Sequence, residues 1–432
     1  MKLQILSFGN FKLQTRLHEN ENWRSQFVTS NYGKNKKWFL TPFHSFLHIN
    51  YIIYNMREKF LTIFTCIIFG FLIQSLGQNQ TNVDSLNFIF KKGTEGYASF
   101  RIPAIVTTVK GTLLAFAEGR KKGASDSGDI DLVMKSSNDQ GKTWSQLKVI
   151  RDDADNVCGN PAPVVDRTTG MIYLLSTWNL GADNEKSIIN HTNKDSRKVY
   201  VLSSSDNGEN WSEAKEITAS VKPNNWTWYA TGPCHGIQVE KGAAKGRLII
   251  PCDHIESGTN KYYSNIIYSD DHGKSWKIGG TTPQDLVNES TVAELSNGNL
   301  MLNMRNYDRT LKTRKVSLSS DSGMTWGNIY SDSTLIESIC QGSLLSVAPK
   351  RKGKTQLFFI NPADQNNRRN MTLRVSMDDG KSWLKSKSLF SGPSAYSDIT
   401  GLTDGSIGCL YEAGYKSAYE GIVFQKVSLK DL

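Results

Sequence analysis

The sequence predicts an all-β protein built as a six-bladed β-propeller, and three observations lead to that fold. The octapeptide pattern Ser-x-Asp-x-Gly-x-Ser/Thr-Trp occurs five times. Its tryptophans recur about every 60 residues, and each copy follows an alternating or apolar run that is typical of a strand. A four-stranded sheet with its turns takes about 40–60 residues, so residues 78–432 have room for about six such sheets.

The repeated octapeptide has the composition of a tight turn. Its Ser and Asp side chains bond nearby backbone groups, its Gly adopts a positive φ, and its Trp packs on the neighbouring sheet. A calcium loop shares part of the pattern, but no copy has the Glu that closes such a loop. We therefore expect five structural hairpin turns, at residues 137–144, 204–211, 269–276, 319–326 and 376–383. The sixth sheet lacks the repeat, and we expect residues 86–90 to close it by pairing with 422–427.

The N-terminal segment has the pattern of a targeting sequence. A basic start at Met56 leads into about 14 apolar residues, too few for an ordinary membrane-spanning helix. An uncleaved membrane anchor with a cytoplasmic basic arm is the alternative. Without such an anchor, the protein has no integral membrane domain and is secreted, to the periplasm or outside of a bacterium. We expect an upstream non-structural extension, a secretory signal peptide, a short leader and the propeller domain at residues 1–55, 56–77, 78–87 and 88–429.

Charge and cysteine usage exclude several classes of protein. The net charge is +10, but residues 1–55 alone contribute +5, so residues 78–432 carry no strongly basic stripe for nucleic acid. Five scattered cysteines follow the signal segment, which is neither a disulfide framework nor a zinc pattern. The seven histidines show no ligand spacing either. We expect a monomer without metal or cofactor.

The five repeats resemble the Asp boxes of the sialidase (neuraminidase) superfamily. Phe100-Arg101-Ile102-Pro103 resembles that family's signature near the start of the propeller, and the resemblance covers roughly residues 88–429. It implies a retaining exo-α-sialidase that cleaves terminal sialic acids from glycoproteins, glycolipids or oligosaccharides. It also implies a tyrosine nucleophile and a covalent sialyl-enzyme, in place of the usual pair of carboxylates.

A site for sialic acid must bind the carboxylate on its anomeric carbon, and arginine is suited to that contact. The resemblance assigns the role to Arg101, Arg305 and Arg368, with Arg369 as the alternative to Arg368. Arg120 matches a further arginine on the carboxylate side of the pocket. Other arginines are expected to make surface salt bridges, and we place Arg309 and Arg314 in that group.

The resemblance also implies the reacting groups. Tyr396 matches the nucleophile, which reaches the anionic substrate as a neutral phenol. A phenol is weak at neutral pH and needs an adjacent base, and Glu289 matches that base. Asp126 matches the general acid on a mobile loop, although Asp129 and Asp131 compete by proximity.

Further positions are implied around the pocket. Glu412 matches the acid that orients Arg101. Trp226 and Trp228 are either a rim platform for glycan or ordinary core. The positions matching the lining for the N-acetyl and glycerol groups are Asn160, residues 232–235, Asp253 and His254.

Three other functions remain open. A trans-sialidase, including an intramolecular one, would use the same site and differ in its acceptor. A non-catalytic sialic-acid-binding propeller should lack the Tyr–Glu pair or the acid. A glucanase or assembly factor with Asp boxes would not need three converging arginines.

Overall fold

The computed structural model describes residues 86–348 and 355–432. The expected extension at 1–55, the signal peptide at 56–77 and all but the last two residues of the leader at 78–87 lie outside the described residues. What is described belongs to one compact unit. Among the described residues, no helix is long and apolar enough to span a membrane.

The chain forms four sheets, antiparallel throughout except for one parallel bridge between Ile130 and Val157. The first sheet runs β2-β3-β4-β6-β7-β8-β9, with β5 beside β4. Its strands are β2 (Ser99–Thr107), β3 (Leu113–Arg120), β4 (Ile130–Ser137), β5 (Lys148–Arg151), β6 (Val157–Val165), β7 (Ile172–Asn179), β8 (Lys198–Ser204) and β9 (Lys215–Glu216).

Two smaller sheets and a seven-stranded sheet complete the fold. The second contains β10 (Trp226–Thr231), β11 (Ile237–Gln238), β12 (Leu248–Glu256), β13 (Tyr262–Ser269) and β14 (Lys277–Thr281). The third contains β15 (Val287–Glu294), β16 (Leu300–Asn306), β17 (Thr313–Ser319) and β18 (Tyr330–Ile336). The fourth contains β19 (Ser343–Val347), β20 (Gln356–Pro362), β21 (Arg369–Ser376), β22 (Lys385–Gly401), β23 (Ile407–Ala413), β24 (Gly421–Val427) and β1 (Phe88–Lys91). Short helices are α2 (Glu185–Ile189), α3 (Thr218–Val221) and the 3-10 helix Leu429–Asp431.

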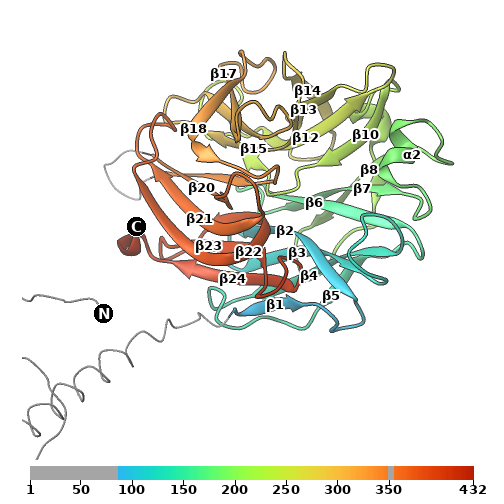
Figure 1. The fold of residues 1–432 in the computed structure, drawn as a ribbon, viewed down its shortest axis with the longest axis horizontal. Helices are drawn as coiled ribbons and strands as arrows, with labels where there is room; N and C mark the ends of the chain where they lie inside the picture. Colours follow the sequence, from blue (N-terminus) through green and yellow to red (C-terminus); the bar gives the residue numbers. More distant parts are fainter. Residues whose placement is uncertain (1–85, 349–354) are drawn as a thin grey trace, which may run out of the picture. The chain divides into compact units, whose positions relative to one another are not determined.

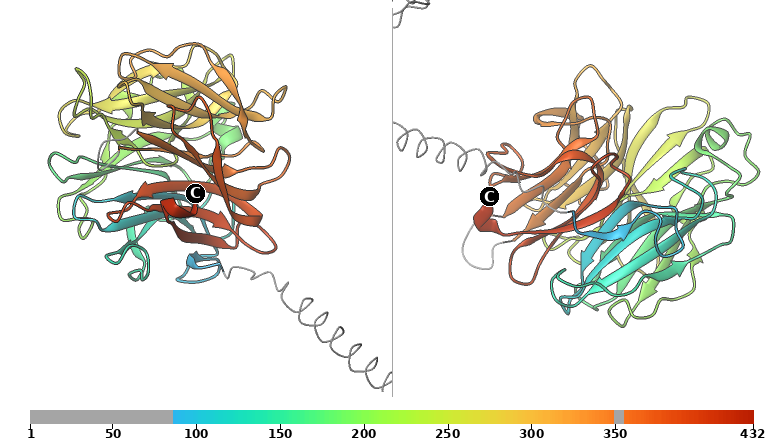
Figure 2. Two further views of the ribbon diagram at one scale, coloured as in Figure 1. Left: turned by 90° about the vertical axis from the view of Figure 1, so that its left-hand side faces the viewer. Right: turned by 60° about the horizontal axis from the view of Figure 1, so that its bottom comes forward.

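The sheets follow one another around a common centre. In Figure 1 the colours run once around the molecule in chain order, and Figure 2 shows the same sheets from two further sides. Inner strands contact each other in a closed circle, in the order β2, β6, β12, β15, β19, β22 and back to β2. The all-β prediction is therefore confirmed, and the fold is of the β-propeller type.

The circle closes through the two ends of the described chain. The strand β1 pairs with β24, with Phe88 opposite Val423 and Phe90 opposite Ile422. This confirms the pairing expected between residues 86–90 and 422–427. The first described strand thereby completes the sheet of the last one, and the described sheets form a closed ring.

The five repeats form nearly identical turns. In every copy the Ser hydroxyl donates to the Asp carboxylate and accepts from the Gly amide, at 2.7–3.0 Å. The carboxylate also accepts from the residue at position seven, for example Thr143. Bonds from Thr143 and Ser137 lower the pKa of Asp139 to about 2. These carboxylates are used within the turns, as the sequence predicted.

Two of the repeat tryptophans, Trp144 and Trp276, join neighbouring sheets. Trp144 packs edge-on against Phe424, with the ring centroids 5.2 Å apart. Trp276 packs in the same way against Tyr173 of β7, and its turn glycine Gly273 lies directly beneath the Tyr173 ring. The turn therefore serves both as a hairpin end and as a contact to the sheet beside it.

The close approach at Gly273 gives a stability prediction. Gly273 and Gly93 share a φ of +76°, but a Cβ at Gly273 would lie 2.2 Å from Tyr173, whereas Gly93 has open space. Gly93→Ala should lose about 1 kcal/mol of unfolding free energy because of the left-handed backbone. Gly273→Ala should lose a further ~1–3 kcal/mol from overpacking. Denaturant unfolding measures both, and equal losses would contradict the proposed contact.

Candidate active site

A cavity of about 180 Å³ is lined by residues from all four sheets. Its basic members are Arg101, Arg120, Arg197, Arg305 and Arg368. Its acidic members are Glu118, Asp126, Glu185, Asp253 and Glu289. Its aromatic members are Trp228, Tyr307 and Tyr396, and the remaining lining residues are neutral: Ile102, Val157, Asn160, Ala230 and Asn288. This is a small, strongly polar cavity in which five guanidinium groups can donate hydrogen bonds to an anionic ligand.

Three of the arginines surround Tyr396. Arg305, at the end of β16, donates from Nη1 to the tyrosine hydroxyl at 2.9 Å. The guanidinium carbons of Arg101 and Arg368 lie 5.2 and 5.5 Å from the centre of the Tyr396 ring. Of the two alternative arginines, Arg368 lines the cavity, whereas Arg369 is exposed on β21 and does not.

Glu412 connects the strand of Arg101 to the strand of Tyr396. Its fully buried carboxylate accepts from Nε and Nη2 of Arg101 at 3.0 and 3.3 Å. It also accepts from the backbone amides of Ile102 and Tyr396. Burial acts to lower the pKa of Arg101, but Glu412 outweighs it, so the guanidinium stays charged. Glu412 does not itself line the cavity.

Tyr396 and Glu289 form a short hydrogen bond at the floor of the cavity. The phenol donates to Glu289 Oε1 at 2.5 Å, and Arg305 donates to the other carboxylate oxygen at 2.7 Å. Burial and the Glu289 carboxylate raise the pKa of Tyr396 well above its ordinary value, while Arg305 and Arg368 act to lower it. The resting phenol is therefore neutral, with an acceptor for its proton already in place.

Asp126 projects from the loop between β3 and β4, and its side chain is 72% exposed. It pairs with Arg120 Nη1 at 2.8 Å and lies 3.7 Å from Arg101 Nη1. Although the side chain is solvent-exposed, partial desolvation by the surrounding protein acts to raise the pKa of Asp126, and Arg120 and Arg101 outweigh it and hold the pKa below its ordinary value. Of the rival acids, Asp131 is fully buried against Tyr97, and neither Asp129 nor Asp131 lines the cavity.

The opposite wall contains a residue that the sequence analysis missed. Arg197 donates to the side chains of Asn160, Asn179 and Thr177 and to the Tyr229 carbonyl. Burial lowers its pKa to about 10. Arg197 directly precedes the alternating strand β8. An arginine at the end of a predicted strand was therefore the sequence signal that could have indicated this residue.

Comparisons with known proteins show the family of the chain. Residues 111–409 match the family model of the BNR repeat-like domain. An exo-alpha-sialidase of Aspergillus fumigatus is 31% identical over 77% of this chain and 85% of its own length. The chain belongs to the sialidase superfamily.

Two further relatives define the extent of the match. A Bacteroides fragilis sialidase is 33% identical over 79% of this chain and 64% of its own length. The solved structure of the Hadza microbial sialidase Hz136 is similar with a TM-score of 0.72 and 31% identity, covering 80% of this chain and 68% of that one. The chain thus spans about two thirds of the length of these two proteins.

Of the positions predicted to line the pocket of this superfamily member, Asn160 and Asp253 line the cavity, whereas residues 232–235 and His254 do not. His254 is fully buried, stacks on Trp226 with 3.4 Å between ring centroids, and does not line the cavity. Burial lowers the pKa of His254 to about 4. Trp226 belongs to the core, whereas Trp228 lines the cavity with its ring 3.8 Å from the Arg197 guanidinium. A β-bulge between Trp226 and Tyr229 separates the two tryptophans, which regular alternation would have placed on one face.

One arginine differs from the expectation. The prediction that Arg314 makes a surface salt bridge is wrong, because Arg314 is fully buried and pairs with the equally buried Glu337 at 2.8 Å. Arg309 pairs with the same carboxylate at 3.3 Å from a side chain that is 27% exposed. An alternating strand pattern did not distinguish a buried arginine on β17 from an exposed one.

The Tyr396–Glu289 contact gives a spectroscopic prediction. Glu289→Gln removes the negative charge that raises the pKa of Tyr396, while Arg305 and Arg368 stay, so the pKa of Tyr396 should fall. Protein labelled with ¹³C at tyrosine Cζ would report it in an NMR pH titration, with Tyr396→Phe assigning the signal. Tyr97, which donates to the buried Asp131 at 2.6 Å, is the internal control and should not move. An unchanged Tyr396 titration would contradict the contact.

Proposed function

We propose that this chain is an exo-α-sialidase that hydrolyses terminal sialic acids of glycoproteins, glycolipids or oligosaccharides with retention of configuration. The observation that carries the proposal is the phenol of Tyr396, bonded to Glu289 at 2.5 Å within a ring of three arginines. A non-catalytic sialic-acid-binding propeller would need the arginines but not this pair.

The arginines fit the one feature that distinguishes sialic acids from other terminal sugars, a carboxylate on the anomeric carbon. Arg101, Arg305 and Arg368 lie around the Tyr396 side chain and can bind the carboxylate through several N–H donors. A carboxylate nucleophile would meet the negative charge of the substrate at this position. A neutral phenol avoids that repulsion, which explains why tyrosine suits the place that Asp or Glu fills in most glycosidases.

In the first step, Asp126 donates its proton to the glycosidic oxygen as the bond from that oxygen to the anomeric carbon breaks. The oxygen of Tyr396 forms a bond to the same carbon while Glu289 takes the phenol proton. In the second step, water attacks the anomeric carbon and gives a proton to Asp126. The bond to Tyr396 breaks, and Glu289 returns the proton to the phenol. Two inversions leave the configuration unchanged.

The general acid must be protonated when substrate is bound, although Arg120 and Arg101 keep Asp126 ionised in the free protein. Binding of the substrate favours protonation of Asp126, because the substrate carboxylate binds Arg101 and reduces the positive charge near Asp126. Substrate binding therefore raises the pKa of Asp126 toward its ordinary value. The exposed loop position of Asp126 leaves it accessible to protons from solvent.

The same proposal includes the architecture and the fate of the chain. We assign six blades by dividing each of the two large sheets in two. The seven-stranded sheet divides within the long strand β22, and the eight-stranded sheet divides at the single parallel bridge between β4 and β6. In this assignment, residues 88–429 are the catalytic domain. Residues 56–77 direct its export. The exported protein acts as a monomer and needs no metal or cofactor.

The function is tested with a sialoside and the variant Tyr396→Phe. Phenylalanine has no oxygen to form the bond to the anomeric carbon, so kcat should fall by more than about 100-fold. Binding of sialic acid should change little because the arginines remain. Tyr411→Phe, which removes a buried hydroxyl outside the cavity, is the control.

Product analysis by NMR completes that test. The α anomer should appear first for a retaining hydrolase, whereas transfer to lactose or an anhydro product would indicate the trans-sialidase alternatives. Undiminished turnover by Tyr396→Phe would remove the tyrosine from its proposed role, and sialic-acid binding without turnover by the unmodified protein would leave a lectin.

The general acid is tested by its dependence on the leaving group. Asp126→Asn should reduce kcat/KM for sialyllactose by ~10²–10⁴-fold, but far less for an aryl sialoside whose leaving group needs no proton. In the unmodified protein, kcat/KM for sialyllactose should decline as pH rises, because the protonated acid is lost above a pKa that lies below its ordinary value. Asp129→Asn, three residues along the loop, is the matched control. An equal loss on both substrates would exclude Asp126 as the acid.

A further inference from the structure

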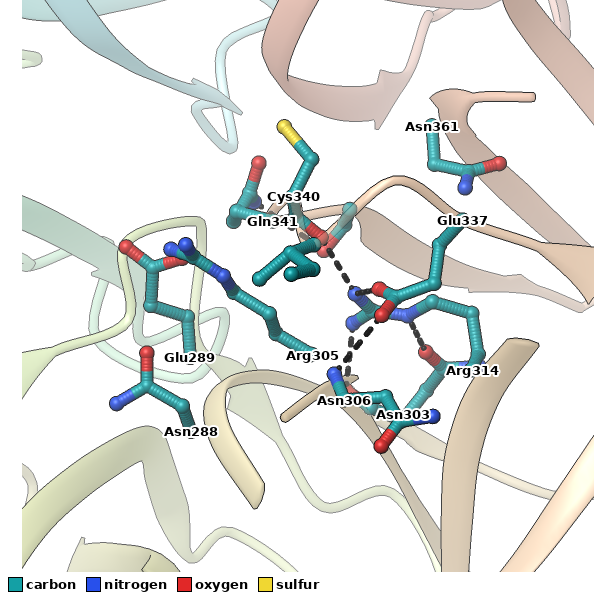
Figure 3. Close-up of polar contacts among 12 residues, drawn as sticks. Asn288, Glu289, Asn303, Arg305, Asn306, Arg314, Glu337, Cys340, Gln341 and Asn361 are labelled. Atoms are coloured by element: carbon teal, nitrogen blue, oxygen red, sulfur yellow. Dashed lines mark hydrogen bonds and ion pairs between the residues drawn. The ribbon is translucent and has the colours of Figure 1, made fainter. Parts of the chain in front are cut away.

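Arg314 and Glu337 form a buried ion pair close to the cavity residue Arg305 (Figure 3). Neither residue lines the cavity, and both side chains are fully buried. Burial raises the pKa of Glu337, and Arg314 together with the Asn306 amide opposes that rise. A buried ion pair contributes little to stability compared with well-packed apolar side chains. Its presence therefore calls for an explanation other than stability.

One end of the pair fixes the peptide that follows Arg305. Glu337 Oε1 accepts from the backbone N–H of Asn306 at 3.0 Å, and this N–H belongs to the same peptide plane as the Arg305 carbonyl. Figure 3 shows the Glu337 carboxylate between this peptide and the Arg314 guanidinium, with the Arg305 side chain extending to Glu289. The point at which Arg305 leaves β16 is therefore held by Glu337.

The other end fixes the connection between β18 and β19. Arg314 donates from Nη1 to the Cys340 carbonyl at 2.7 Å, as well as to Glu337. The preceding carbonyl, of Ile339, accepts from Nη2 of Arg368 at 3.0 Å. Ile339 has a φ of +57°, a strained conformation for a β-branched residue that persists only where its surroundings hold it. Arg314 supplies one of those contacts.

We propose that Arg314 and Glu337 are positioning residues that place two cavity arginines, Arg305 and Arg368, at the separation a carboxylate requires. The inference rests on the proposed role of those arginines in binding sialic acid. Arg305 comes from the third sheet, and Arg368 precedes a strand of the fourth. The ion pair links the backbone segments that support these two arginines. Glu337 holds the peptide after Arg305, and Arg314 holds the Cys340 carbonyl, next to the Ile339 carbonyl that Arg368 contacts.

The test uses Glu337→Gln in the full chain. The substitution keeps the side-chain shape but replaces one acceptor oxygen with an NH₂ donor. One of the donors that Glu337 now satisfies, from Arg314, Arg309 or Asn306, is then left without an acceptor. The arginines should shift, and misplacement of a binding group by about 1 Å costs up to ~10²-fold.

The measurement is the affinity for 2,3-dehydro-N-acetylneuraminic acid relative to its C1 carboxamide, which lacks the carboxylate. Glu337→Gln should weaken binding of the acid by ~10- to 100-fold and change binding of the amide much less. Its KM should rise more than its kcat falls. Arg305→Lys, which alters the carboxylate contact directly, should reproduce the same loss of discrimination.

Asp166→Asn is the matched control. Asp166 is a fully buried, hydrogen-bonded carboxylate that accepts from Thr169, Gln238 and His272, away from the cavity. Its substitution should lower the melting temperature and leave the acid-to-amide ratio unchanged. If Glu337→Gln behaves in the same way, the ion pair is structural and the inference is overturned.

Arg314→Lys is the second variant in case Glu337→Gln does not fold. The lysine keeps a positive charge beside Glu337, but one ammonium group cannot reproduce the planar fork that reaches Asn303, Glu337 and Cys340 together. The same loss of carboxylate discrimination is expected, and an unchanged ratio would overturn the inference. Failure of the unmodified protein to bind or hydrolyse any sialoside would instead refute the proposed function, and the inference with it.

Discussion

Mutual repulsion among five guanidinium groups is the constraint on which the rest of the site depends. The arginines lie around one cavity of about 180 Å³, where low dielectric strengthens the repulsion between like charges. Three of them are paired in the free protein, Arg101 with Glu412, Arg120 with Glu118 and Arg305 with Glu289. The two others donate to neutral groups. The cavity therefore folds with most of its charge balanced and still presents donors to an anion.

The pairing carboxylates also connect elements that are distant in the sequence. Glu412 bonds Arg101, the Ile102 amide and the Tyr396 amide, which joins β23 to β2 and β22. Asp398, two residues beyond Tyr396, accepts from the backbone of Ile105 and the hydroxyl of Ser343. Each carboxylate therefore places a negative charge and also fixes the position of a neighbouring strand. Strands of different sheets thus hold the reacting groups more firmly than a single loop would.

The parts of the structure that repeat or match a short motif were accessible from the sequence. The octapeptide has one physical solution in all five places, and Arg101 lies inside a recognisable tetrapeptide. Arg197, Trp228 and the burial of Arg314 were not accessible, because each depends on tertiary context. A β-bulge turns Trp228 toward the cavity while Trp226 faces the core. Local alternation does not encode where a strand gains an extra residue or which sheet will cover an arginine.

The pairing of β1 with β24 determines the order in which the molecule can become complete. Phe88 and Val423 are about 330 residues apart, so β1 has no partner until the chain has been synthesised beyond Val423. Until then the edges of β1 and β24 expose unpaired N–H and C=O groups, which are templates for association with other chains. Ring closure is thus a late, long-range event in folding. A nascent or truncated chain that lacks its last strand is vulnerable to aggregation however well its earlier sheets have formed.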